Sequence, residues 1–524
     1  MSRIQLWFRN PIFLLGLAAG LIAFVVQSGE VGSADTMHRL QSTHAFWTSQ
    51  PPVFPNEYPE FGVHGRNGSL QSWYGIGQSL LMLPSDILGT SVAKLKIFDQ
   101  YGDTDPTVRD IVVVYLSQIF VTALTALLCF KLLRQFAFTI NQSIAGTFAF
   151  LLATTHLHYT QNMMENNYIC LLTLAGFSFQ YQWLQSGSRR ALLIGTAAFG
   201  LNLLTRITTG MDLLAGALFV LMVLWFEKVR GRAFWSRCRE YAAIALPVYC
   251  FFGLLDRLYQ FYRFGSFTNT YAGLIARETI ARDPSLPRNW PWTTPWHQGF
   301  LGALFLPEKS IFLFDPLIVL ALLLLVLHWK RLLPVVRAYA LATGIMLLAY
   351  LSFYARYFAW AGDFSWGDRY VSTCVELMAL LAIPILLKYR REAGRLVWTV
   401  GIVLLCASFV IQLESLMFWL PLEIYQEETL GHPTYVIALR AKNIVAFALG
   451  KMDAWGLNNE SMTQDPWDYV HITCWNFLPF LLRRVGQAPS WAVRIAFLVW
   501  GAGLAALAAT LLRLRQLARP LAQG

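Results

Sequence analysis

Charged residues are scarce in this sequence of 524 residues. Asp, Glu, Lys and Arg make up 14% of the chain, whereas a soluble protein carries about 25%. Hydrophobic residues make up 56% of the chain, and 19 tryptophans bring the aromatic share to 15%. Aromatic rings of this kind gather at the two surfaces of a bilayer. The composition therefore excludes a soluble protein with a single anchor and indicates a protein that crosses the membrane many times.

Several recognisable sequence patterns are also missing. The seven cysteines form no CxxC pair, so we expect no disulfide framework and no cysteine-based metal site. There is no Walker sequence and no GxGxxG between a strand and a helix, and hence no sign of a nucleotide-binding domain. There is no internal repeat, and no basic stripe with stacking aromatics indicates a nucleic-acid partner.

Long apolar runs are abundant, and about twelve of them can cross a hydrocarbon core of about 30 Å. The first run lacks a small-x-small cleavage site, so we expect a helix there and not a signal peptide. We predict an all-α polytopic membrane protein with about twelve transmembrane helices and long extracytoplasmic loops. The runs are Pro11–Gln27, Ile111–Phe130, Phe138–Thr155, Tyr168–Leu184, Ala191–Thr205, Thr208–Phe226, Tyr241–Phe261, Ile311–Leu327, Val335–Phe353, Tyr370–Leu387, Leu396–Leu413 and Trp491–Leu512.

Basic residues concentrate in the short connections between these runs. If the N-terminus lies inside, the inner segments hold 21 of the 41 Lys and Arg but only three of the 30 acids. The positive-inside rule then predicts that both termini are cytoplasmic. The long connections all fall on the outer face, where we expect the protein to act. We divide the chain into a core of residues 1–413 with outer loops 28–110, 262–310 and 354–370, an outer loop 414–490, and a last helix with a basic tail, 491–524.

Two acids on the outer face are candidates for chemistry. Asp35 follows the first apolar run and could accept a proton from an attacking hydroxyl, or it could simply cap the next helix. The link HLHYTQNMMENNY before the fourth run carries Glu165. Glu165 could bind an acceptor hydroxyl or share the site with Asp35, or it could simply be solvated in the loop. His156 and His158 in the same link form an HxH pair, which would need a third ligand from elsewhere to bind a metal.

Two cations on the same face could bind a phosphate group. Lys309, in GALFLPEKSIFLFDP, could neutralise a lipid phosphate or only snorkel to the interface. Arg369, in WAGDFSWGDRY, could hold phosphate through two parallel hydrogen bonds or pair with Asp363 or Asp368. Further cations on this side are Arg66, Arg206, Arg257 and Arg356.

A glycine-rich segment precedes the second run. RNGSLQSWYGIGQSLLMLP contains an apolar stretch that is too short to span a bilayer. We expect it to lie in the membrane interface, with Tyr74–Pro84 covering the site.

The order of these segments resembles the bacterial members of the GT-C glycosyltransferase superfamily, near the protein O-mannosyltransferases and aminoarabinose transferases. The residues that carry the resemblance are Asp35, Tyr74–Pro84, Glu165, Pro307–Pro316 and Trp360–Tyr370. The resemblance implies transfer of a sugar from a polyprenyl-phosphate carrier to a lipid, glycan or protein acceptor, outside the bacterial inner membrane.

The expected site combines two acids, three cations and a group of lining residues. Asp35 would be the catalytic base and Glu165 a second catalytic acid of the site. The donor phosphate would be held by Lys309, Arg369 and Arg66, because the leaving group needs cations and not a strong acid. We expect no organic cofactor, and the sequence leaves open whether a divalent metal ion is required. The substrate cavity would be lined by Tyr74, Gln78, Trp360, Trp366 and Asp363.

Two other functions are compatible with the sequence. A polysaccharide polymerase or ligase would use similar chemistry with a diphosphate-linked donor. A transporter or flippase could also have twelve helices with both termini inside. Transporters of that kind carry internal repeats and polar sites at the membrane midplane, whereas here the polar residues gather at one face.

Overall fold

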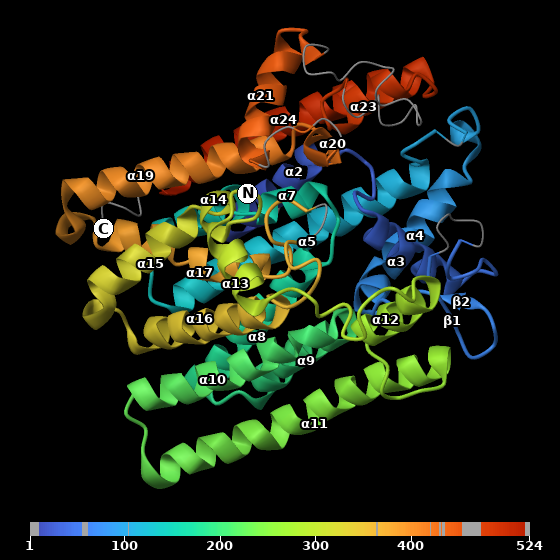
Figure 1. Cartoon of the computed structure of the whole chain (residues 1–524). Coiled ribbons are helices and arrows are strands. Elements are labelled where there is room, and N and C mark those ends of the chain that lie inside the picture. The colour runs from blue at the N-terminus through green and yellow to red at the C-terminus, as the bar shows by residue number, and fades with distance from the viewer. Residues whose placement is uncertain are drawn as a thin grey trace.

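The computed structural model describes residues 10–54, 61–102, 104–362, 365–419, 421–428, 431, 435–452 and 473–518. Within these ranges the protein is almost entirely helical (Figure 1). One short antiparallel ladder joins β1 (Val63–His64) to β2 (Leu70–Gln71), with Val63 opposite Gln71. All twelve apolar runs of the sequence are helical, in agreement with the predicted fold class.

In the part of the chain that the structure describes, six helices are long and apolar enough to cross a bilayer. They confirm a helical membrane-type architecture, while the count of twelve spans stays a prediction. The six are α5 (Val108–Gln135), α10 (Gly210–Phe226, preceded by the 3-10 turn η2, Ile207–Thr209), α11 (Gly231–Phe264), α16 (Pro334–Tyr354), α19 (Arg390–Ser415) and α24 (Ser490–Ala518).

Shorter helices fill the space between these six. The two shorter apolar helices are the first and third runs of the sequence, and α8 carries polar side chains that lower its mean hydropathy. This group comprises α2 (Pro11–Val26), α6 (Ile140–Leu152), α8 (Asn166–Ser186), α9 (Arg189–Thr205), α15 (Leu317–His328), α17 (Ser372–Ala379) and α18 (Ala382–Lys388).

Two of the predicted runs are each divided into two helices. Ile311–Leu327 breaks at Asp315, because a residue that precedes proline avoids the helical conformation, and Asp315 has φ −129° and ψ 68°. Tyr370–Leu387 breaks between α17 and α18, upstream of Pro384, whose ring would clash with a helical carbonyl four residues earlier. Neither run therefore forms one continuous span.

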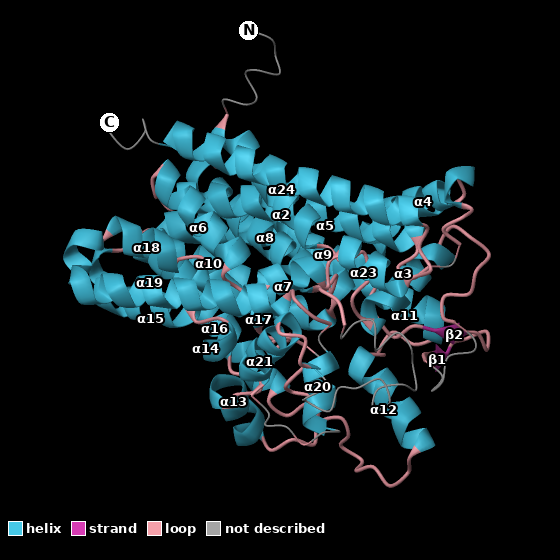
Figure 2. Cartoon of the chain, turned by 90° about the horizontal axis from the view of Figure 1, so that it is seen from above, coloured by secondary structure: helices cyan, strands magenta, loops and turns pink. Residues whose placement is uncertain are grey.

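The remaining elements are short and lie in the connections. They are α3 (Ala34–Ala45), α4 (Gly77–Ala93), η1 (Lys96–Phe98), α7 (His156–Gln161), α12 (Tyr271–Arg282), α13 (Trp296–Phe305), α14 (Ile311–Phe314), η3 (Trp329–Arg331), α20 (Pro421–Glu428), α21 (Val436–Ala448) and α23 (Leu478–Val485). Figure 2 shows α12, α13 and α20 to one side of the parallel helices.

The core of the bundle is aromatic at its centre. The ring of Phe177 meets those of Phe199, Phe219 and Tyr339 edge to face, with centroids 5.3–5.4 Å apart. Edge-to-face packing is the favoured geometry for such rings. These contacts join α8, α9, α10 and α16 into one unit, and α11 lies along its edge beside α9 (Figure 1).

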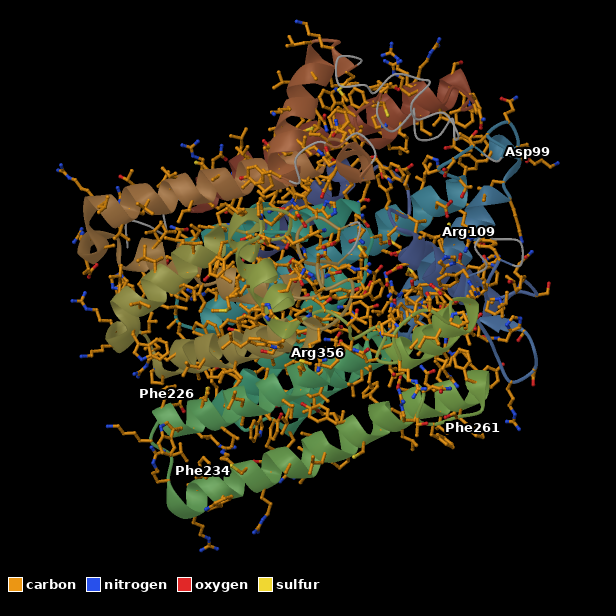
Figure 3. The ribbon with its side chains drawn as sticks, in the orientation of Figure 1. Asp99, Arg109, Phe226, Phe234, Phe261 and Arg356 are labelled. Atoms are coloured by element: carbon orange, nitrogen blue, oxygen red, sulfur yellow. The ribbon has the colours of Figure 1, made fainter. Side chains whose placement is uncertain are left out.

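The two ends of the bundle differ in character. The basic turns between α10 and α11 and between α18 and α19 lie at one end, and α3, α4, the β1–β2 ladder and α12 lie at the other (Figure 1). Figure 3 labels Phe226 and Phe234 at the first end and Phe261, Asp99 and Arg109 at the second. The two basic connections thus lie at the end of the fold opposite to the first long connection of the sequence.

Candidate functional site

Asp35 is held by two segments that are distant in the sequence. It lies in the first turn of α3, where the Ser33 side chain caps the helix by accepting a hydrogen bond from the backbone N–H of Thr36. A carboxylate is favoured at this end of a helix dipole. Asp35 Oδ1 accepts a hydrogen bond from the Tyr74 hydroxyl at 2.5 Å, and Oδ2 accepts one from Arg369 Nη1 at 2.9 Å. The carboxylate therefore links α3 to the segment before α4 and to the loop before α17.

Glu165 is the centre of a second ion cluster beside the first. It lies at the start of α8, and its Oε2 accepts a hydrogen bond from Arg39 Nη1 at 2.8 Å. Its Oε1 accepts a hydrogen bond from Arg206, at the end of α9. The Arg39 and Glu165 side chains are only 4% and 3% exposed. The Arg39 guanidinium also lies 4.1 Å from the centre of the Tyr74 ring, so the two clusters are in contact.

Glycines allow these segments to approach closely. A Cβ on Gly75 would collide with the backbone of Leu204, and one on Gly77 would collide with Thr205. The YGIG sequence thus lets the start of α4 press on the end of α9, directly before Arg206. The chemistry of the site depends on this approach, because it brings Tyr74 and Arg206 to the same cavity.

The loop that carries Arg369 is also held in place. Gly362 has φ +81°, and a Cβ there would lie 2.9 Å from Cγ of Arg369 and 2.7 Å from Oγ of Ser365. Such a left-handed backbone suits glycine. Lys309 Nζ donates a hydrogen bond to the Ser365 carbonyl at 2.5 Å, and the Asn166 side chain donates one to the Arg369 carbonyl at 2.6 Å. The backbone of the loop is thereby fixed from two sides.

These groups surround a cavity of about 190 Å³, which we call the Asp35 cavity. Its charged wall contains Asp35, Glu165, Arg39, Arg206 and Arg369, together with the adjacent pair Asp256 and Arg257. Aromatic residues also line the cavity, and they include Trp73, Tyr74, Tyr271, Trp292, Tyr354, Tyr357 and Tyr370.

An apolar groove of about 670 Å³ adjoins the Asp35 cavity. It lies between α10, α11 and α16, and Leu214, Ala217 and Ala245 are among its lining residues. Ile207, Thr208 and Phe353 line both the cavity and the groove. A molecule with a charged head and a long apolar tail would match this pair of spaces.

The arginines keep both acids ionised. Burial raises the pKa of Asp35, but the guanidinium groups of Arg369 and Arg39 outweigh it, and the pKa lies below the ordinary value of 3.8. Burial also raises the pKa of Glu165, and Arg39 and Arg206 outweigh it, so this pKa lies well below 4.5. Since guanidinium groups stay charged in proteins, three cations face two anions, and the cluster carries one net positive charge.

These pKa shifts predict how stability changes with pH. Both acids have lower pKa values in the folded than in the unfolded protein, so their contribution is fully present above about pH 5 and is lost as the pH falls through the folded values. We expect the thermal midpoint of the detergent-solubilised protein to be level at neutral pH and to fall in acid. In Arg369→Ala the leading cation beside Asp35 is gone, so the pKa of Asp35 is no longer lowered as far and the total fall in acid should be smaller than in the wild type. A midpoint that rises on acidification, or identical curves for the two proteins, would contradict this account of the cluster.

The structure brings together four of the residues expected from the sequence. Asp35, Tyr74, Glu165 and Arg369 all line the cavity. The other six lie elsewhere or are not described. Arg66 is exposed, with its guanidinium 5.5 Å from the Phe261 ring centre.

Lys309, expected to bind the donor phosphate, and three of the expected lining residues make contacts outside the cavity. Lys309 is bonded to Ser365 and does not line the cavity. Gln78 is buried and donates a hydrogen bond to the Met163 carbonyl, Trp366 is fully buried against Phe314, and Trp360 packs on Gly302. Asp363 lies outside the described residues. Sequence order alone could not separate the residues that support the loop from those that line the cavity.

Arg39 is the principal residue that the sequence reasoning missed. It follows Asp35 by four positions on α3, and side chains at this spacing lie on one helix face. This spacing of four residues could have identified Arg39 from the sequence as a neighbour of Asp35. The sequence indicates Arg206 only as a further cation on the outer face, and its pairing with Glu165 depends on how α8 and α9 pack.

A second group of side chains lies away from the cavity. Ligand-type atoms of His156, Cys170 and Glu376 lie within 4.8 Å of one another, and all three side chains are buried. His158 is not in this group, since its ring stacks near Trp366. All seven cysteines are free thiols.

No protein-family model matches the chain, and no curated protein matches it. The site must therefore be interpreted from its own geometry.

Proposed function

We propose that this protein is a membrane glycosyltransferase that moves a sugar from a polyprenyl-phosphate donor to an acceptor hydroxyl. The observation that carries the proposal is the junction of the charged Asp35 cavity with the apolar groove between α10, α11 and α16. A polyprenyl-phosphate sugar has both parts, a charged and sugar-bearing head and a long apolar tail. In the proposed arrangement the chain crosses the bacterial inner membrane about twelve times, with both termini cytoplasmic and the cavity on the extracytoplasmic side.

The charge of the cluster favours a monophosphate donor. A sugar linked through one phosphate is a phosphodiester with one negative charge, which matches the one net positive charge of the three arginines and two acids. A diphosphate-linked donor carries two negative charges and would leave one of them uncompensated in a largely buried site. The polymerase or ligase alternative is therefore less well matched.

The proposed reaction is a single displacement. The acceptor oxygen attacks the anomeric carbon, the bond from that carbon to the phosphate oxygen breaks, and the proton of the hydroxyl passes to the Asp35 carboxylate. The phosphate leaves with the electron pair, and arginine side chains stabilise its charge. Attack from the side opposite the phosphate inverts the anomeric configuration.

Arg369 would couple donor binding to the strength of the base. Without donor, Arg369 is hydrogen-bonded to Asp35, which lowers the pKa of that carboxyl and makes it a weak base. A donor phosphate competes for the same guanidinium. When Arg369 turns to the phosphate, burial raises the pKa of Asp35, and the carboxylate becomes a better proton acceptor. Arg39 and Arg206, already paired with Glu165, would hold the other side of the cavity.

Donor consumption by the purified protein in lipid nanodiscs tests the function. We expect monophosphate-linked sugars to be converted to free polyprenyl phosphate, as measured by mass spectrometry. Turnover of diphosphate-linked donors alone would favour a polymerase or ligase. Movement of an unaltered sugar lipid across sealed vesicles, without donor consumption, would favour a transporter.

A substitution in the groove tests how the donor tail binds. Ala217→Trp should fill part of the groove and raise the KM for a long-chain donor about tenfold, which corresponds to about 1.4 kcal/mol of binding, while kcat changes little. Ala505→Trp, on the exposed face of α24, is the matched control and should behave as the wild type. An equal rise in KM for a donor with a very short tail would show that the groove does not hold the tail.

A further inference from the structure

The group formed by His156, Cys170 and Glu376 lies within the bundle, apart from the Asp35 cavity. His156 begins α7, Cys170 lies on α8 and Glu376 lies on α17. The three side chains are 0% exposed. Three polar or ionisable groups have therefore been removed from solvent in one place, where burial of each is costly.

The group is incompletely satisfied by protein contacts. Among the described residues, neither ring nitrogen of His156 has a hydrogen-bond partner. Its Nδ1 lies 3.8 Å from Oε2 of Glu376, which is too far for a hydrogen bond. The other carboxylate oxygen, Oε1, accepts a hydrogen bond from the Thr155 hydroxyl at 3.0 Å. A buried imidazole without partners needs an explanation, and a ligand shared by all three side chains would supply one.

We propose that His156, Cys170 and Glu376 bind one divalent transition-metal ion of the zinc type. Imidazole nitrogen, thiolate sulfur and carboxylate oxygen are the zinc donors of proteins, whereas Mg²⁺ and Ca²⁺ select oxygen ligands. Zinc bonds are about 2.0–2.3 Å long, so two ligand atoms of a tetrahedral zinc ion lie about 3.3–3.8 Å apart. The three ligand atoms lie within 4.8 Å of one another, so binding an ion would draw them together by a distance on the order of 1 Å. The thiolate and the carboxylate together carry two negative charges, which neutralise a divalent ion in an apolar surrounding.

The position of the site suggests its role. Cys170 follows Glu165 in α8 by little more than one helical turn, and Glu376 lies in the helix that follows Arg369. An ion bound between them fixes α8 to α17 and so holds the segments that carry Glu165 and Arg369 in register. This metal site is independent of the proposed reaction, and it needs no access to substrate.

Metal content and cobalt spectroscopy test the proposal on the full chain in nanodiscs. Protein from zinc-supplemented cells should contain about one zinc per chain, as expected for a single site, measured by mass spectrometry of the metal. Cobalt substituted for zinc should give a thiolate-to-metal charge-transfer band. His156→Ala, Cys170→Ser and Glu376→Gln should each lose most of the metal. His158→Ala, on the same short helix, and Cys474→Ser, another buried thiol, are the matched controls and should keep the metal.

These measurements distinguish a metal site from a buried cluster whose side chains bind no metal ion and interact only through hydrogen bonds. Wild-type protein without zinc and without a cobalt band overturns the proposal, as does zinc retained in Cys170→Ser. If the three ligand variants fail to fold, the wild-type metal content and the cobalt band decide the question, because that band requires a cysteine ligand. Absence of sugar transfer in every assay would contradict the proposed function, but it would leave the conclusion about the metal site unchanged.

Discussion

Asp35→Asn is expected to lower the rate of donor consumption by about 10²–10⁴-fold, the usual contribution of a positioned general base. Asparagine has nearly the same shape and can still accept a hydrogen bond from Tyr74 or Arg369, but it cannot take up a proton from the acceptor. The KM for the donor should change far less than kcat. The measurement is polyprenyl phosphate release by protein in nanodiscs, at equal amounts of folded protein.

Asp99→Asn is the matched control for this experiment. Asp99 is exposed and lies at the same end of the bundle (Figure 3), so its replacement removes a like charge without touching the cavity. We expect wild-type rates. Retention of more than about a third of the rate in Asp35→Asn would sink the assignment of Asp35 as the base, since a general base contributes far more.

Glu165→Ala should produce the largest loss of stability, on the order of 3–5 kcal/mol. The substitution leaves the buried Arg39 and the half-buried Arg206 without the carboxylate that each now contacts. Removing one partner of a buried ion pair costs more than the pair itself contributes, because the remaining charge stays desolvated. The measurement is the free energy of unfolding, or the thermal midpoint, in a fixed detergent.

Two variants make this prediction specific. Glu240→Ala removes one acid from an ion pair with Arg189 whose arginine side chain is 79% exposed, and a pair of that kind contributes about 0–1 kcal/mol. The double variant Glu165→Ala with Arg39→Gln should recover part of the lost stability, because the interaction is pairwise. A single Glu165→Ala variant as stable as Glu240→Ala would show that the cluster does not hold the fold together.

Most of the long helices could be predicted from the apolar runs of the sequence. The apolar runs correspond to helices because a chain segment in lipid must satisfy its backbone polar groups internally. Pro316 and Pro384 coincide with the two runs that break, but Pro247 lies inside the unbroken α11, so proline alone does not tell which runs divide. The number of helices that truly cross the bilayer depends on neighbours and tilt, which local hydropathy does not describe.

The sequence by itself placed Asp35, Glu165 and Arg369 near membrane boundaries, because each follows or precedes an apolar run. It could not show that Arg369 pairs with Asp35 instead of Asp363 or Asp368, nor that Lys309 bonds to Ser365. Those pairings depend on which loops meet when the helices pack.

Only the tertiary structure decided the remaining features. Arg206 meets Glu165 because α8 and α9 pack against each other, and Gly75 and Gly77 allow α4 to press on the end of α9. His156, Cys170 and Glu376 are dispersed in the chain and form no spacing motif, yet three helices bring them together. Local sequence determines which segments are helical through hydropathy and backbone preference, whereas side chains from distant segments become neighbours only through packing.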